Sequence, residues 1–427
     1  MTGARRLHLA VRLPDTGADG GTGGRADFAS LVRSARTAER GLFDFLLLGG
    51  GTLPYGAGDG VHDGVDAALR PEPVTLLSAL AAVTDRLGLA AAVLARTAEP
   101  FTAARALASL DHLSGGRAAW HMADPPGAGG RAEEFIRTAR RLWDSWPSGG
   151  EARPFSHSGP YFTTEGEFTL PRPPQGHPVI IRAAVPGEDP EEAAGVADVL
   201  ITRYEPQGPP GTGRASGAGA VGGSAAHEGE PGGRSVMADR RTLAEVTVVL
   251  GASDAEARER AAEIRRRRIP AERAIPAVER IRGRDLPDGP IPGLPGVPGP
   301  HGSPGPQGSP GFDPAPDSVL TGRRVPEGDR GAIPEAGERP ARETVAEASG
   351  RQSFIGTPGR VAAAMEEYVR GGAADGFVLV PQPGGGGLGE FVAGVVPLLQ
   401  ERGVFRTRYT GTTLRSHLGL TEPVWKG

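Results

Sequence analysis

Short apolar runs alternate with segments of helical period along most of the chain, and this alternation restricts the fold more than any other feature. It is the pattern of successive β–α units around a parallel sheet, which is either closed into a barrel or open and doubly wound. The strand candidates are Leu7–Leu13, Phe43–Leu48, Leu87–Leu94, Ala118–Ala123, Pro178–Ala183, Val199–Thr202, Leu243–Leu250 and Gly376–Val380. Eight candidates in series favour the closed (β/α)8 TIM barrel.

Helical periodicity fills most of the intervals between these strands. The expected helices cover residues 28–40, 74–84, 101–113, 132–146, 254–268 and 388–402. Between the fourth and fifth strands, polar and apolar residues alternate over Tyr161–Phe168, a pattern that predicts a small inserted hairpin. We therefore expect a single domain over residues 1–427 with insertions, since a plain barrel needs only about 250 residues.

Two stretches are too rich in glycine and proline to pack a core. Residues 204–235 follow the sixth strand and lack helical period, so we expect a disordered insertion and a barrel with one outer helix lost or shortened. Residues 284–340 are also expected to be flexible. Within them, residues 293–311 carry glycine at every third position, but a short collagen-like run inside a globular chain cannot recruit two partner strands.

Composition excludes several classes of function. The formal net charge is −4 and no window concentrates basic residues, which argues against nucleic acid as a partner. The chain has no cysteine, so disulfides, thiolate nucleophiles and cysteine-ligated metals are excluded, and no metal is expected. The longest apolar run, Leu87–Ala95, is shorter than the ~18 residues of a membrane span, and the N-terminus lacks a signal-peptide pattern. We expect a cytoplasmic protein.

Two segments carry a resemblance to a known family. Phe101–Trp120 reads FTAARALASLDHLSGGRAAW, and Gly356–Pro423 contains GTPGRVAAAMEEYVRGGAADGFVLVP and VVPLLQERGVFRTRYTGTTLRSHLGL. They resemble a helix–strand unit, the last barrel unit and the C-terminal tail of the luciferase-like flavin-dependent monooxygenase superfamily. The similar branch contains the nitrilotriacetate, dibenzothiophene-sulfone and pristinamycin monooxygenases.

This resemblance implies an active site at the C-terminal ends of the barrel strands. It also implies reduced FMN as a diffusible cofactor, an NAD(P)H:flavin reductase as partner, and O₂-dependent oxygenation of a small organic substrate. A homodimer is compatible with the resemblance. The glycine strings at 20–24 and 384–387 lack the context of a Rossmann or P-loop turn, which agrees with NAD(P)H reacting on another protein. Residues 284–340 stand where the family has its active-site lid.

At several positions the chain departs from the family pattern. Relatives usually have an acidic residue where this chain has Gly49–Gly51, and an asparagine where it has His121. The loop Pro125–Gly130 lacks the family's His and Tyr, and Ala184–Gly187 lacks the serine near the phosphate. These departures leave two alternatives open: a degenerate, non-catalytic barrel that serves as a binding or subunit partner, and an F420-dependent oxidoreductase.

The expected site residues follow from their places at strand ends. His121 is the catalytic candidate, either as a proton donor or in stabilising the flavin's reaction with oxygen; the alternative is a histidine hydrogen-bonded in the rim. Arg182 is the expected main phosphate ligand with Arg96 or Arg203 assisting, unless the three are separate, salt-bridged arginines. The other expected cofactor contacts are Thr97, Gly50 and Gly187.

Overall fold

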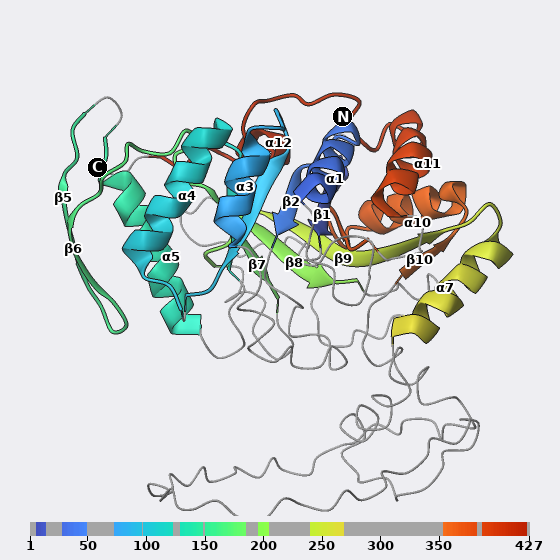
Figure 1. Cartoon of the computed structure of the whole chain (residues 1–427), viewed down its shortest axis with the longest axis horizontal. Helices are drawn as coiled ribbons and strands as arrows, with labels where there is room; N and C mark the ends of the chain where they lie inside the picture. Colours follow the sequence, from blue (N-terminus) through green and yellow to red (C-terminus); the bar gives the residue numbers. More distant parts are fainter. Residues whose placement is uncertain are drawn as a thin grey trace, which may run out of the picture.

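The computed structural model describes most of the chain that carries the predicted strands and helices (Figure 1). The described residues are 6–13, 28–48, 72–95, 97–122, 129–147, 150–184, 195–204, 240–268, 353–381 and 387–424. The predictions made for 204–235, apart from residue 204, and for 284–340, including the triplets at 293–311, lie outside them.

The strands form a closed parallel barrel, as the sequence predicts. Its eight strands are β1 His8–Leu13, β2 Phe45–Leu48, β3 Gly88–Val93, β4 Ala118–Met122, β7 Val179–Ala183, β8 Val199–Arg203, β9 Arg241–Leu250 and β11 Gly376–Leu379. Each pairs in parallel with the next, β8 pairs with β9, and β11 pairs with both β9 and β1, which closes the ring. Every strand overlaps the apolar run that predicted it.

Helices pack around this barrel. They are α1 Phe28–Arg40, α3 Pro73–Ala81, α4 Pro100–Ser114, α5 Gly129–Asp144, α7 Asp254–Arg268, α10 Pro358–Arg370, α11 Gly387–Glu401 and the short α12 Leu414–Leu418. Neighbouring helices contact one another in the order α5, α4, α3, α1, α11, α10, a series that can be followed across Figure 1.

Local sequence signals set where these helices begin and end. The Glu72 carboxylate accepts hydrogen bonds from the Val74 and Thr75 amides at 2.9 and 2.6 Å, and Pro73 occupies the first turn of α3. Proline at this position loses no helical hydrogen bond, and a carboxylate there satisfies otherwise unpaired amides. At the other end of a helix, Gly115 adopts φ 65° and terminates α4.

Three strands lie outside the closed ring. β5 Pro154–Ser158 and β6 Thr163–Glu167 form the antiparallel hairpin that the alternation predicted, although its first strand begins before the alternating segment. β10 Ser353–Gly356 pairs in parallel with the far end of β9 and was not predicted. β9 can accept this extra neighbour because it is longer than the strands beside it and extends beyond the ring.

Side chains alternate between the barrel lumen and the outer helices. Lumen-facing residues form one apolar cluster that includes Ala10, Leu47, Ala90, Ala119 and Ile181. The intervening residues belong to a larger cluster shared with the helices. This period of two is expected when both faces of a parallel sheet are buried.

The C-terminal tail closes the N-terminal end of the lumen. Leu414 and Leu418 are fully buried and belong to the lumen cluster of apolar residues. Leu414 lies against Gly88, the first residue of β3, where an added Cβ would come within 2.7 Å of its side chain. Arg241, the first residue of β9, donates to the Leu418 carbonyl at 2.7 Å. These contacts cover the N-terminal end of the lumen.

Candidate functional site

Four polar side chains lie on the lumen side of the barrel toward the C-terminal ends of its strands. Each follows a lumen-facing apolar residue by two positions, so alternation gives it the same face. We call this group the polar lumen cluster; its members are Arg12 of β1, His121 of β4, Arg203 of β8 and Glu245 of β9. Arg203 and Glu245 are direct partners in the register of β8 and β9.

An ion pair crosses part of this lumen. Arg12 Nη2 lies 3.1 Å from Glu245 Oε2, and the two side chains are only 10 % and 16 % exposed. Strand β11 separates their strands, so the contact matches the layers that alternate strands form inside such barrels. Nε and Nη1 of Arg12 are buried and have no hydrogen-bond partner among the described residues.

His121 lies deeper than a rim histidine would. Its side chain is fully buried, and the strand register places it one layer nearer the N-terminal end than Arg12 and Glu245. Neither ring nitrogen has a hydrogen-bond partner within the described part of the chain. Burial, and to a lesser extent the charge of Arg12, lowers the pKa of His121 well below its ordinary value. At neutral pH the ring is uncharged, so it offers one donor and one acceptor rather than an acidic imidazolium.

Unsatisfied buried groups of this kind are unusual. Leaving a buried donor or acceptor without a partner costs about 1–3 kcal/mol, and most such groups in folded proteins are satisfied. Here two neighbouring side chains, Arg12 and His121, carry four such atoms in one lumen. The polar lumen cluster is therefore suited to a ligand that accepts and donates hydrogen bonds.

The predicted cofactor contacts are only partly brought together. Arg203 is exposed at the end of β8, two positions after the lumen-facing Ile201. Arg182 is buried between the lumen-facing Ile181 and Ala183, so its side chain leaves β7 on the opposite face, toward the helices. The structure thus does not place Arg182 and Arg203 on one face. A position at a strand end does not by itself determine the direction of a side chain.

The other predicted contacts add little to the site. Thr97 is exposed in the turn before α4, where its hydroxyl lies 3.5 Å from the Leu94 carbonyl. Arg96, Gly50 and Gly187 lie outside the described residues.

Two members of the polar lumen cluster were missed by the sequence reasoning. Arg12 and Glu245 each stand inside a strand, whereas the expected site residues stand at strand ends. A charged residue within a strand that is buried on both faces is itself a signal, because such a charge needs a partner. That signal could have identified both residues.

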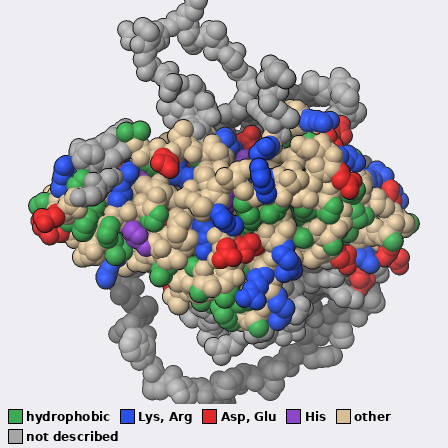
Figure 2. Space-filling view, turned by 90° about the horizontal axis from the view of Figure 1, so that it is seen from above, with side chains coloured by type: hydrophobic (Ala, Val, Ile, Leu, Met, Phe, Trp, Pro, Cys, Tyr) green, Lys and Arg blue, Asp and Glu red, His purple; other side chains and the backbone are tan. Residues whose placement is uncertain are grey.

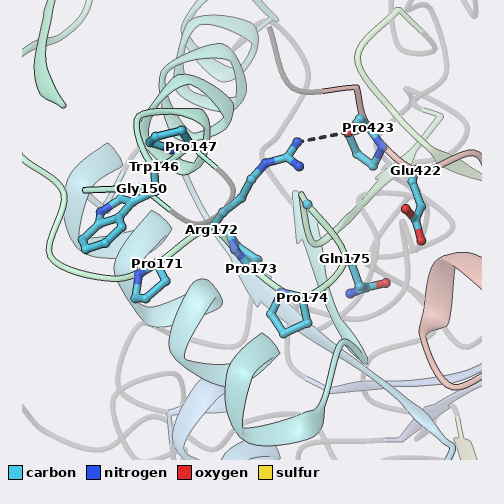
Figure 3. A pocket seen from close by; sticks show the side chains of 11 residues that line it. Trp146, Pro147, Gly150, Pro171, Arg172, Pro173, Pro174, Gln175, Glu422 and Pro423 are labelled. Carbon is cyan, nitrogen blue, oxygen red and sulfur yellow. Dashed lines mark hydrogen bonds between the residues drawn. The ribbon is translucent and has the colours of Figure 1, made fainter. Parts of the chain in front are cut away.

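A surface cleft of about 450 Å³ lies elsewhere, near the N-terminal end of β7 (Figure 3). Arg172 is fixed beside it, since it donates to the Pro423 carbonyl at 3.0 Å and to Asp144 at 3.2 Å. Around the described barrel, no group of three or more His, Asp or Glu residues could hold a metal ion, and no described helix is long and apolar enough to cross a membrane. In the face shown in Figure 2, basic and acidic side chains are interspersed.

Comparisons with known proteins agree with this fold. The family model for luciferase-like monooxygenases matches residues 8–375. Nitrilotriacetate monooxygenase component A of Aminobacter aminovorans is 33 % identical over 93 % of this chain and 91 % of its own length. One of the subunits of pristinamycin IIA synthase from Streptomyces pristinaespiralis is 32 % identical over 97 % and 94 %. The structure of EDTA monooxygenase from Chelativorans sp. BNC1 superposes with a TM-score of 0.63 at 24 % identity, covering 98 % of this chain and 99 % of the other.

Proposed function

Because this chain belongs to the luciferase-like monooxygenase family, we propose that it binds reduced FMN over the polar lumen cluster and oxygenates a small organic substrate with O₂. The observation that carries this proposal is the pair of buried side chains, Arg12 and His121, whose polar atoms lack partners among the described residues. They lie toward the end of the barrel where enzymes of this fold build their sites.

The residues of the lumen fit the polar edge of a flavin ring. Such an edge carries carbonyl and ring-nitrogen acceptors beside an N–H donor, and Arg12 and neutral His121 offer complementary groups. Small side chains line the lumen around them, among them Ala10, Ala90 and Ala119. When bound, reduced flavin supplies the reaction with O₂, while the protein orients the reactants and excludes water.

We assign the FMN phosphate to the rim rather than to the depth of the lumen. Arg203 is exposed there on the lumen face and can form charge-assisted hydrogen bonds to an oxyanion. Arg182 is on the other face of β7 and is not assigned the main role. His121 lies nearest the position proposed for the ring, where it holds an uncharged hydrogen-bonding group.

We also propose that a separate reductase supplies the reduced flavin. In support, two similar proteins are each named as one part of a larger enzyme: one is a monooxygenase component, and the other belongs to a synthase with more than one subunit. The GxGxxG run Gly384–Gly389 leads into α11 in the last unit of a closed barrel, and not in the first βαβ unit of a doubly wound sheet, where such a run binds a dinucleotide. The match of one family model to residues 8–375 supports a single barrel domain.

Anaerobic titration with photoreduced FMN tests the cofactor assignment. Saturable binding that is tighter for the reduced than for the oxidised form is expected, and NADH alone should not be oxidised by the purified protein. Absence of binding at high micromolar FMN would contradict the proposal and favour a non-catalytic barrel. Binding of the deazaflavin F420 in place of FMN would favour the other alternative.

A further inference from the structure

Arg12 uses only part of its hydrogen-bonding capacity. Its Nη2 bonds Glu245 Oε2 at 3.1 Å, while Nε and Nη1 are buried without a partner in the described structure. A guanidinium remains protonated at any physiological pH, so these donors carry a permanent positive charge. Glu245 fixes one side of the guanidinium and leaves its other donors available to a ligand.

Positive charges outnumber negative charges among the four described residues of the polar lumen cluster. Arg12 and Arg203 are cations, Glu245 is an anion, and His121 is uncharged at neutral pH. Where water is excluded, a cation with unused donors, such as Arg12, favours a ligand with a complementary negative charge. Of the two cations, Arg12 lies deeper and is shielded from water, so its preference for an anion is the less screened.

We propose that Arg12, positioned by Glu245, is the residue through which the site selects reduced over oxidised flavin; this rests on the flavin assignment above. The reduced ring ionises to an anion whose charge is shared by N1 and the C2 carbonyl, whereas the oxidised ring is neutral. A fixed cationic donor at that edge stabilises the anion far more than the neutral ring. Arg12 is a binding residue, and Glu245 is a positioning residue that acts through it.

Binding of both redox states to matched variants tests this role. The variants are Arg12→Met, Arg12→Lys, Glu245→Gln and, as a control, Arg105→Met on the exposed face of α4. We expect Arg12→Met to weaken reduced FMN by about tenfold or more and oxidised FMN by less than about threefold, in line with loss of a charge-assisted hydrogen bond. Arg12→Lys should recover part of the loss, and Arg105→Met should match the wild type.

The midpoint potential of bound FMN provides a readout independent of turnover. Selective loss of affinity for the reduced form must make this potential more negative in Arg12→Met, and to a smaller extent in Glu245→Gln. Arg12→Met leaves Glu245 buried without its cation, which destabilises the fold. The double variant Arg12→Met/Glu245→Gln removes both charges and is therefore measured alongside it. Circular dichroism confirms that each variant is folded before titration.

The possible outcomes distinguish the role of Arg12 from the proposal that the protein binds reduced FMN. If the wild-type protein fails to bind reduced FMN, the proposed function fails and the role of Arg12 fails with it. If the wild type binds reduced FMN but the folded single or double variant keeps the same ratio of affinities, the selection is not made by Arg12 and this inference alone is overturned. Equal losses for both redox states would overturn it too, since they would indicate lost packing rather than lost charge.

Discussion

The C-terminal tail should be essential for the stability of the barrel because Arg415 ties it to the strands. The Arg415 side chain is 5 % exposed, and its Nη2 lies 2.9 Å from Asp198 Oδ2. Its Nε donates to the His177 carbonyl at 2.9 Å, and its Nη1 donates to the Thr421 carbonyl at 3.2 Å. Arg415→Ala would remove all three contacts and leave the Asp198 carboxylate without its main cation.

The magnitude follows from what remains for Asp198. Removing one partner of a buried ion pair typically costs about 3–5 kcal/mol. Asp198 is 17 % exposed and still accepts the Ile180 amide at 2.8 Å, so the lower end of that range applies. We expect Arg415→Ala to lower the free energy of unfolding by about 3 kcal/mol. Arg408→Ala, at an exposed position of the same tail, should change it by less than about 0.5 kcal/mol.

Urea unfolding followed by far-ultraviolet circular dichroism measures both variants. Asp198→Asn and the double variant with Arg415→Ala complete a double-mutant cycle, in which we expect a coupling energy above about 1 kcal/mol. Equal midpoints for Arg415→Ala and Arg408→Ala, at equal slopes, would refute the reasoning that the tail is held by this buried pair.

Three further predictions concern acid stability, catalysis and the phosphate. Burial raises the pKa of Asp44, but the charges of Arg406 and His8 outweigh it and hold this pKa well below its ordinary value of 3.8. The contribution of Asp44 to stability is therefore complete above pH 3.8 and is lost as the pH falls below it. Urea unfolding should show that Asp44→Asn loses less stability in acid than the wild type does. Because burial lowers the pKa of His121, the pH profile of kcat should show no ionisation of this residue near pH 6.5. His121→Ala should reduce kcat more than it reduces FMN affinity. An ionisation near pH 6.5 that is present in the wild type and absent from the variant would contradict an uncharged role. Arg203→Ala should weaken FMN binding by about tenfold and Arg182→Ala by less, as measured by fluorescence titration, and the reverse order would place the phosphate outside the lumen.

The sequence was sufficient for the barrel because its strands are buried on both faces. Such strands appear as continuous apolar runs, and Phe45–Leu48 or Gly88–Val93 can be recognised without knowledge of their neighbours. β10 was missed because Ser353–Gly356 is short and pairs with β9 outside the ring.

The site was harder to predict because it depends on the face each residue takes. Arg182 and Ala183 are adjacent at one strand end, yet only the register of the closed barrel shows that Ala183 faces the lumen and Arg182 does not. The Arg12–Glu245 pair joins residues 233 positions apart on strands that are not neighbours. Neither the local sequence pattern nor the composition predicts a contact between two such distant residues.

A crystal structure of the protein with reduced FMN, grown without oxygen, tests the central claim most directly. We predict that the polar edge of the flavin ring lies over the polar lumen cluster, within hydrogen-bonding distance of Arg12 Nε or Nη1 and of a ring nitrogen of His121. A flavin bound elsewhere, such as in the cleft beside Trp146 and Arg172, or a ring whose polar edge faces away from Arg12, would contradict this account.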